Sequence, residues 1–295
     1  MRITPERSRK IFRNPSPPTE VWEEQFDGFN QELKELAGRD WRKVPDNDLW
    51  YYFHDLAYMR LQREVFDYLF PVCLNYWYAS LMRNESAEQG DAEFHRALYR
   101  GNILDRMVSP RQRNQIYEYF HDGLLDRIEM ERGFVYRDKS TPAYAWMGRF
   151  NSLGYIAPII EDIWSSWWDF DHPGKAVSAI MYASGLIYLK GENPIFGVWT
   201  PDKGGGGPCL TESDADIFDA VWLSENISYM KSTLSVDYIQ NKMQQAASLL
   251  SAEPEARIAQ QVAKDAMGRA DVIQIRMEDM LEILEKPYSG DFMED

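Results

Sequence analysis

The sequence predicts a mainly α-helical protein, built as two packed helical domains or as one large helical array. Apolar residues recur at spacings of three and four, which is typical of helices with one buried face. The clearest case is a C-terminal stripe made of Ile258, Val262, Ala266, Ala270, Ile273, Met277 and Met280. No segment between turns alternates apolar and polar residues as a half-buried strand would. Hydrophobic residues make up 44% of the 295 residues and aromatic residues 14%, which is the composition of a folded chain with a core.

A basic segment opens the chain. Residues 1–18 contain five lysine and arginine side chains against a single acidic one, Glu6. Chain termini are commonly poorly ordered unless packing ties them down. We therefore expect this segment to be a flexible arm.

A helical domain is expected over residues 19–135. Thr19 can cap a helix that ends at Gly38. A second helix should begin at Asp46 and be kinked or interrupted at Pro71, because proline removes a backbone donor and clashes with the preceding turn.

A helix start stands out in the stretch Ser-Pro-Arg-Gln. Ser109 can cap the helix, Pro110 suits its first position, and the Gln112 side chain can reach back to the cap. A helix from there to about Arg132 is expected. Residues 133–144 combine Gly, Thr-Pro and mixed charge, which indicates a connection between the two domains.

The second helical domain is expected over residues 145–288, with an acidic tail at residues 289–295. A long loop rich in glycine and proline interrupts it near residues 190–210. Helices are expected over residues 155–170, 175–189, 211–230, 236–250 and 252–285.

The balance of charge restricts the partners of the protein. The formal net charge is −15, which argues against nucleic acid, because such binding uses Lys and Arg to neutralise phosphates. A basic protein is the partner that an acidic surface attracts.

The sequence predicts a cytoplasmic location and no membrane binding. No apolar run has the length of a transmembrane helix, and the N-terminus lacks the apolar core of a signal peptide. Cys73 and Cys209 lack metal-ligand spacing and are expected to be reduced thiols. No cofactor is predicted.

The tetrapeptide Tyr-Phe-His-Asp occurs twice, at residues 52–55 and 119–122. One interpretation is a metal-dependent phosphohydrolase of the all-helical kind, whose signature is a His, then a His-Asp pair, then a distant Asp. The metal would activate a water for attack on phosphate. In this interpretation His121 and Asp122 are the catalytic pair.

The metal ligands of that interpretation would be His95, His121 and Asp122, together with Asp169 or Asp162. The alternative is packing, because each histidine of the two tetrapeptides lies one helical turn from aromatic or apolar residues. With four histidines in the whole chain, packing is the preferred interpretation.

A tryptophan-rich segment is a candidate binding surface. Trp164, Trp167 and Trp168 fall on one helical face and are followed by Asp169 and Asp171. Such rings can anchor a partner protein or stack a sugar, and the carboxylates can hold a cation. The alternative is a core helix that ends in an aspartate-rich turn.

The loop Gly204–Gly207 invites comparison with loops that hold a phosphate ahead of a helix. The lysine that should follow the glycines is missing, and Pro208 removes a donor. We expect instead a loop that closes over a partner, with Trp199 and Asp202 as contacts, or a plain connection.

A limited resemblance covers residues 20–130. It is carried by Tyr-Leu-Phe-Pro at residues 68–71 and by the helix start Ser-Pro-x-Gln-Arg at residues 109–113. Both are similar to features of a family of uncharacterised bacterial proteins. The resemblance implies a small helical domain and no activity, since the motifs are structural.

The acidic, aromatic-rich and helical character of the whole chain resembles that of the immunity proteins that neutralise toxins passed between competing bacteria. This resemblance implies a non-enzymatic inhibitor that binds a basic toxin domain through an acidic surface with aromatic anchors. The rival hypothesis is the metal-dependent phosphohydrolase. The oligomeric state is left open.

Overall fold

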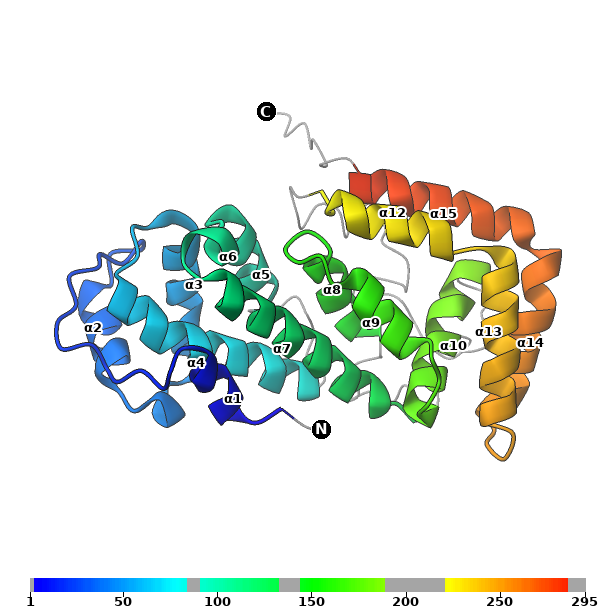
Figure 1. Ribbon diagram of the computed structural model, residues 1–295, viewed down its shortest axis with the longest axis horizontal. Helices are drawn as coiled ribbons and strands as arrows, with labels where there is room; N and C mark the ends of the chain where they lie inside the picture. The colour runs from blue at the N-terminus through cyan, green and yellow to red at the C-terminus, as the bar shows by residue number, and fades with distance from the viewer. Residues whose placement is uncertain (1–2, 84–90, 133–143, 189–220, 286–295) are drawn as a thin grey trace, which may run out of the picture. The chain divides into compact units, whose positions relative to one another are not determined.

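The protein is mainly α-helical, as the sequence predicts. The computed structural model describes residues 3–83, 91–132, 144–188 and 221–285. Fourteen α-helices and two short 3₁₀ helices lie in these ranges, which contain no β-strand (Figure 1). The chain divides into two compact units, residues 1–123 and residues 124–295. The connection predicted at residues 133–144 lies almost wholly outside the described ranges and stays a prediction.

The first unit contains the helices from α1 to most of α7, and the second contains those from α8 to α15. In the first unit and across its boundary the elements are α1 (Pro5–Ile11), α2 (Asn30–Gly38), η1 (Trp41–Lys43), η2 (Asp46–Asp48), α3 (Leu49–Tyr58), α4 (Arg63–Met82), α5 (Asp91–Arg100), α6 (Ile103–Arg106) and α7 (Pro110–Glu129). In the second unit they are α8 (Tyr144–Leu153), α9 (Ile160–Trp167), α10 (Pro173–Ile187), α12 (Ser224–Thr233), α13 (Val236–Leu249), α14 (Glu255–Gly268) and α15 (Ala270–Glu285).

Aromatic packing along α4 forms the core of the first unit. Phe66 and Phe70 stack with their ring centroids 4.7 Å apart, and Phe12 packs edge-on against both. Further along α4, the ring of Trp77 meets Phe120 of α7 at 4.9 Å. Such contacts add to the burial of apolar area that stabilises the unit.

The prediction that residues 1–18 form a flexible arm is wrong from residue 3 onward, because this segment packs against the rest of the first unit. Residues 5–11 form α1, which packs against α4. Ile3 and Ile11 are buried. The Ser8 hydroxyl donates to Asn75 of α4 at 2.9 Å, and Arg7 donates to Asp122 at 2.6 Å. Burial of these apolar side chains ties the terminus down.

The helix predicted to run from residue 20 to Gly38 is half as long, because α2 begins only at Asn30. Residues 21–29 instead direct backbone N–H groups to side chains elsewhere in the unit. Trp22 N–H donates to the Gln62 side chain at 2.9 Å, and Phe26 N–H donates to Asp55 at 2.7 Å. These bonds replace those that a helix would have made.

The helix predicted from Asp46 is interrupted twelve residues before Pro71 rather than at it. A break at residues 59–62 separates α3 from α4, and α4 continues through Pro71. The N–H of Gln62 at the start of α4 donates to the carboxylate of Glu23 at 2.5 Å, so the break is stabilised by a contact with the preceding loop.

The helix start predicted at Ser109 is confirmed. Ser109 N–H donates to Gln112 Oε1 at 3.0 Å, and Gln112 N–H donates to Ser109 Oγ at 3.3 Å. This reciprocal pair satisfies two donors that the first turn of α7 would otherwise leave unpaired. The helix ends at Glu129, three residues before the predicted end.

In the second unit, α10 is buried along its whole described length, from Gly174 to Ile187. The helices α13 and α14 pack along each other and both contact α10. The single helix predicted over residues 252–285 is divided, because Arg269 leaves the helical conformation between α14 and α15. The helix α8 was not predicted.

The described part of the predicted helix 211–230 also starts late, at Ser224. Trp222 N–H donates to Leu284 O and Leu223 N–H to Gly154 O, both at 2.9 Å. These contacts hold residues 221–223 in a non-helical conformation. None of the helices in the described ranges combines the length and apolar character needed to cross a membrane.

Candidate functional site

Five aromatic side chains are exposed together on the first unit. We call Phe26, Phe29, Trp50, Tyr51 and Tyr58 the aromatic face. Each exposes between 38% and 50% of its surface, and they come from only two segments, the loop before α2 and the helix α3. Large aromatic residues more commonly bury most of their area, so this group is unusual for a surface.

Ring contacts join the members of the aromatic face in two groups. The centroid of Phe26 lies 4.7 Å from that of Tyr58, and Phe29 lies 4.9 Å from Tyr51. The His54 ring links Phe26 to Trp50, at 6.1 and 5.6 Å. The rings of the aromatic face thus form two contacting groups on α3 and the adjoining loop, one of Phe29 with Tyr51 and one of Phe26 and Tyr58 with Trp50 through His54.

The loop that carries Phe26 and Phe29 is fixed by polar side chains beneath it. The Gln62 amide donates to Glu20 O at 2.8 Å and accepts from Trp22 N–H at 2.9 Å. The carboxylate of Glu23 accepts a hydrogen bond from the N–H of Gln62. Loop and helix start thus hold each other in place through buried hydrogen bonds, which are costly to leave unmade.

A second set of hydrogen bonds joins the loop to α3. The Gln25 side chain donates to Tyr51 O at 3.1 Å and accepts from Phe29 N–H at 3.1 Å. The carboxylate of Asp55 accepts from Phe26 N–H. Because Gln25 bonds to both Phe29 and Tyr51, it connects two rings of the aromatic face through the backbone.

The two carboxyl groups that anchor the loop are almost completely buried. Glu23 exposes 2% and Asp55 0% of its surface. Burial raises the pKa of Glu23 to about 8, although the hydrogen bond from Gln62 N–H opposes this rise. Burial raises the pKa of Asp55 to about 7, opposed chiefly by the hydrogen bond from Phe26 N–H. The charge of Asp55 further raises the pKa of Glu23, and the charge of Asp27 further raises that of Asp55.

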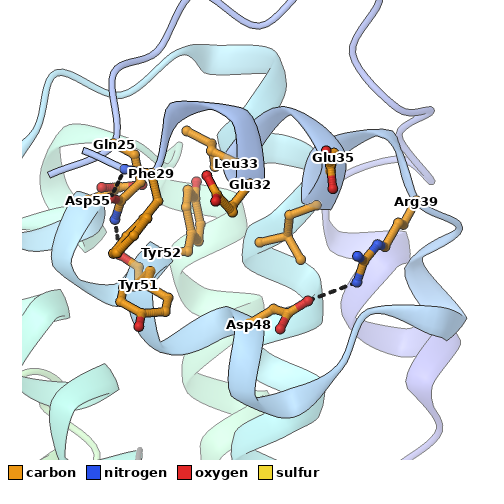
Figure 2. A pocket seen from close by; sticks show the side chains of 11 residues that line it. Gln25, Phe29, Glu32, Leu33, Glu35, Arg39, Asp48, Tyr51, Tyr52 and Asp55 are labelled. Atoms are coloured by element: carbon orange, nitrogen blue, oxygen red, sulfur yellow. Dashed lines mark hydrogen bonds and ion pairs between the residues drawn. The ribbon is translucent and has the colours of Figure 1, made fainter. Parts of the chain in front are cut away.

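A pocket of about 240 Å³ opens beside the aromatic face (Figure 2). Figure 2 shows side chains from α2, α3 and the preceding loop around it. Its lining consists of Gln25, Phe29, Glu32, Leu33, Glu35, Leu36, Arg39, Asp48, Tyr51, Tyr52 and Asp55. Aromatic rings and carboxyl groups therefore meet in one concave surface, which is the usual form of a binding site.

The surface around the pocket is acidic. Residues 20–36 contain six acidic residues and one basic residue, Lys34. Of these acids only Glu23 is buried. The single cation of the pocket lining, Arg39, is paired with Asp48 at 2.8 Å. This part of the molecule thus presents negative charge next to exposed aromatic rings.

The first Tyr-Phe-His-Asp copy belongs to this site. His54 Nδ1 lies 2.7 Å from Asp27 Oδ2, and its ring packs between Trp50 and Phe26. Asp55 turns inward to the N–H of Phe26. His54 and Asp55 of this copy thus both contact the loop before α2, which is the kind of structural role that the packing interpretation predicts.

The second copy also has structural contacts. His121 Nδ1 lies 2.9 Å from Asp122 Oδ1, and Arg7 lies 2.6 Å from Asp122 Oδ2. The hydrogen bond to His121, aided by Arg7, lowers the pKa of the Asp122 carboxyl below its ordinary value. Asp122 thereby connects α7 to α1.

His95, the remaining histidine of the proposed metal site in the first unit, is surrounded by rings. Its centroid lies 5.9 Å from Phe94, 6.1 Å from Phe120 and 6.2 Å from Trp77. Throughout the described residues, no three His, Cys, Asp or Glu side chains are grouped in a way that could hold a metal ion.

The tryptophan-rich segment lies in the core of the second unit. Trp164, Trp167 and Trp168 expose at most 1% of their surface. Trp164 and Trp168 stack at 4.8 Å between centroids, and Tyr182 of α10 packs edge-on against Trp164 at 5.1 Å. Their position matches the core interpretation, and their rings are not available to a partner.

The acidic residues after these tryptophans have partners of their own. Asp171 forms an ion pair with Lys175 at 2.6 Å. Asp169 is exposed and lies close enough to Lys242 to favour its charged form. His172 caps α10 by accepting from Gly174 N–H at 3.2 Å. The segment is thus the aspartate-rich end of a core helix.

Three further predicted features lie outside the described residues. These are the contacts Trp199 and Asp202 and the loop Gly204–Gly207. Their part in binding stays a prediction.

The aromatic face was missed in the sequence, although a signal was present. Trp50, His54 and Tyr58 follow one another at intervals of four, which places them on one face of a helix. The packing interpretation predicts a partly buried stripe here, with the His54 ring among aromatic rings. The stripe at Leu49, Phe53 and Leu56 is the one that is buried.

Comparison of the chain with models of protein families, with curated proteins and with solved structures gave no match.

Proposed function

We propose that this protein is a non-enzymatic binding protein that inhibits a basic protein partner, as a cytoplasmic immunity protein inhibits a bacterial toxin. One observation carries the proposal. The aromatic face presents five exposed rings in two contacting groups on α3 and the adjoining loop, where an ordinary surface would carry scattered single residues. Rings of Trp and Tyr are the side chains that most often dominate binding energy in protein interfaces.

Charge supports the choice of a basic partner. The chain carries a formal charge of −15, and the segment next to the aromatic face has a single lysine among its acids. Complementary charge speeds the encounter of two proteins and disfavours wrong partners. An acidic rim around apolar rings is therefore suited to a basic surface with an apolar centre.

The order of the loop supports the same conclusion. Its backbone is held by Gln25, Asp55 and Gln62 before any partner arrives. A binding surface that is already in place loses little conformational entropy on association. A rigid surface of this kind suits an inhibitor that must bind tightly and quickly.

The test uses the product of the gene next to this one in the native genome. We expect that product to be toxic when expressed alone and harmless when this protein is co-expressed. The two should co-purify at low salt, and binding should weaken as salt is raised, because screening reduces attraction between the charged surfaces.

A surface variant locates the binding site. The double substitution Phe26→Ala and Tyr58→Ala should abolish protection and weaken binding by at least about ten-fold, as loss of aromatic hot spots does. The control is Ile275→Ala, which shortens an equally exposed apolar residue of α15 and should leave binding unchanged. A neighbouring product that is harmless alone, or one that the wild-type protein does not bind, would refute the proposal.

A further inference from the structure

The pocket beside the aromatic face has the chemistry of a receptor for a positively charged group. Four carboxyl groups line it, those of Glu32, Glu35, Asp48 and Asp55, against the single guanidinium of Arg39. Asp48 already engages that guanidinium. The remaining three carboxyl groups form no ion pair with a described lysine or arginine.

The lining of the pocket includes a buried carboxyl group, Asp55, with one oxygen that lacks a hydrogen-bond partner in the part of the chain that the structure describes. Asp55 is fully buried and lines the pocket. Its Oδ1 accepts from Phe26 N–H at 2.7 Å, whereas its Oδ2 has no hydrogen-bond partner among the described residues. The Gln25 amide lies close enough to lower the pKa of Asp55, but its N–H with hydrogen-bond geometry points to Tyr51 O at 3.1 Å. A buried acceptor that lacks a donor is costly, and a ligand that donates to it would recover that cost.

The walls of the pocket are aromatic. Phe29 and Tyr51 meet at 63° between ring planes, and Tyr52 lies beside them in the lining (Figure 2). A cation over such rings is attracted by their electron-rich faces, most strongly where water is excluded. Arginine is favoured over lysine, because its planar guanidinium can stack on a ring while it donates to a carboxylate.

We propose that this pocket binds one arginine side chain of the protein partner. The inference rests on the proposed function and extends it, because it names the group that the acidic surface recognises. The aromatic face would supply the apolar contact around it, and the pocket would supply the selectivity for a basic residue at the centre of the partner's surface.

The test uses the full chain and a short capped peptide, Gly-Arg-Gly. Leu33 and Leu36 line the pocket, so the NMR signals of their labelled methyl groups report on its occupancy. We expect these signals to move saturably on addition of the arginine peptide. The control peptide carries citrulline, which keeps the shape of arginine without its charge, and it should leave the signals in place.

Two charge-matched variants locate the effect. Glu32→Gln removes one carboxylate of the pocket, and Glu24→Gln removes an equally exposed carboxylate outside its lining. We expect the first to weaken binding of the arginine peptide several-fold and the second to leave it unchanged. Equal shifts with arginine and citrulline, no shift with either, or equal effects of the two variants would overturn the inference.

The outcome is separable from that of the proposed function. If the partner still binds the Glu32→Gln protein with unchanged affinity while the substitutions at Phe26 and Tyr58 abolish binding, the arginine pocket is wrong and the inhibitor remains. If the wild-type protein binds no partner, the inhibitor fails whatever the peptide does.

Discussion

The carboxylate of Asp55 accepts a hydrogen bond from the backbone N–H of Phe26 at 2.7 Å. This bond joins α3 to the loop before α2, alongside the bonds that Gln25 and Gln62 make to the same loop. It also settles the conformation of Phe26, the ring that links Tyr58 to His54 in the aromatic face. The position of a surface residue is thus determined by an interior side chain.

Substitution of Asp55 should show how much this bond contributes. Asp55→Ala leaves the N–H of Phe26 without its acceptor and should lower the free energy of unfolding by about 1–3 kcal/mol. Asp55→Asn keeps an oxygen in place and should cost clearly less. Urea unfolding followed by circular dichroism measures both. Equal losses for the two variants would show that the backbone contact is unimportant.

The stability of the protein should fall as the pH rises from about 4 to about 8. The folded pKa values of Asp55, about 7, and Glu23, about 8, lie above their ordinary values of 3.8 and 4.5. Between the ordinary and the raised value the folded chain holds a proton that the unfolded chain has lost. Stability therefore decreases up to about pH 7 through Asp55 and up to about pH 8 through Glu23, by at most about 1.4 kcal/mol per pH unit for each group.

The variant Glu23→Gln isolates this effect, because the amide cannot ionise and still offers an oxygen to Gln62 N–H. Its stability should depend less on pH than that of the wild type between about pH 4 and about pH 8. The titratable groups around the two carboxyls are Tyr52, Asp27 and His54. Parallel pH profiles of wild type and variant, from thermal unfolding in a series of buffers, would contradict the prediction.

The ion pair of Arg7 and Asp122 should be a weak contact that attaches α1 to α7. Both side chains are more than a third exposed, so screening by water limits the pair to less than about 1 kcal/mol. Asp122→Asn should therefore lower the unfolding midpoint only slightly, and the loss should shrink at high salt.

The same helix allows a test of the phosphohydrolase hypothesis. We expect added Mn²⁺ or Zn²⁺ not to raise the melting temperature of the wild type, and His121→Ala not to change the response to metal. Elemental analysis of protein purified with these ions provides a second readout. If the wild type holds stoichiometric metal and His121→Ala does not, the result would support a metal site that includes His121.

Gly154 should tolerate no side chain. The ring of Trp222 occupies the place where its Cβ would stand, in contact closer than real Cβ atoms allow. Gly154→Ala should therefore lower the stability of the second unit by about 1–3 kcal/mol through overpacking. Gly268 at the end of α14 has nothing within 4 Å of that place, and Gly268→Ala should be neutral or slightly stabilising. Equal effects in calorimetry would refute the prediction.

Local signals in the sequence predicted the elements that local contacts determine. The reciprocal hydrogen bonds of Ser109 and Gln112 join residues three apart. The start of α7 could therefore be predicted from four consecutive residues, 109–112. The helical class was readable for the same reason, since apolar spacing reports which face of each helix is buried.

The loop before α2 could not be predicted in this way. Trp22, Phe26 and Phe29 follow a helical spacing. Their segment is nevertheless not helical, because the N–H groups of Phe26 and Trp22 donate to the side chains of Asp55 and Gln62. Those partners lie 29 and 40 residues away along the chain. Tertiary contacts of this range override local propensity and leave no local signal.

Most of the candidate site could not be predicted from the sequence either, because it also depends on tertiary contacts. Trp164 is buried and Trp50 exposed, although both follow helical patterns of aromatic residues. Which face of an aromatic helix meets solvent depends on its neighbours, such as Tyr182 against Trp164. The pocket arises only when α2 is placed beside α3, so no single segment of sequence contains it.

The separation between anchors and exposed rings has a consequence for evolution. Gln25 and Asp55 stand next to Phe26 and His54 in the sequence but face inward, and Gln62 is likewise buried. Exchange of an exposed ring leaves these anchors intact. Relatives that bind different partners are therefore expected to differ at Phe26, Trp50 and Tyr58 and to retain Gln25, Asp55 and Gln62, so that the same fold can present different binding surfaces.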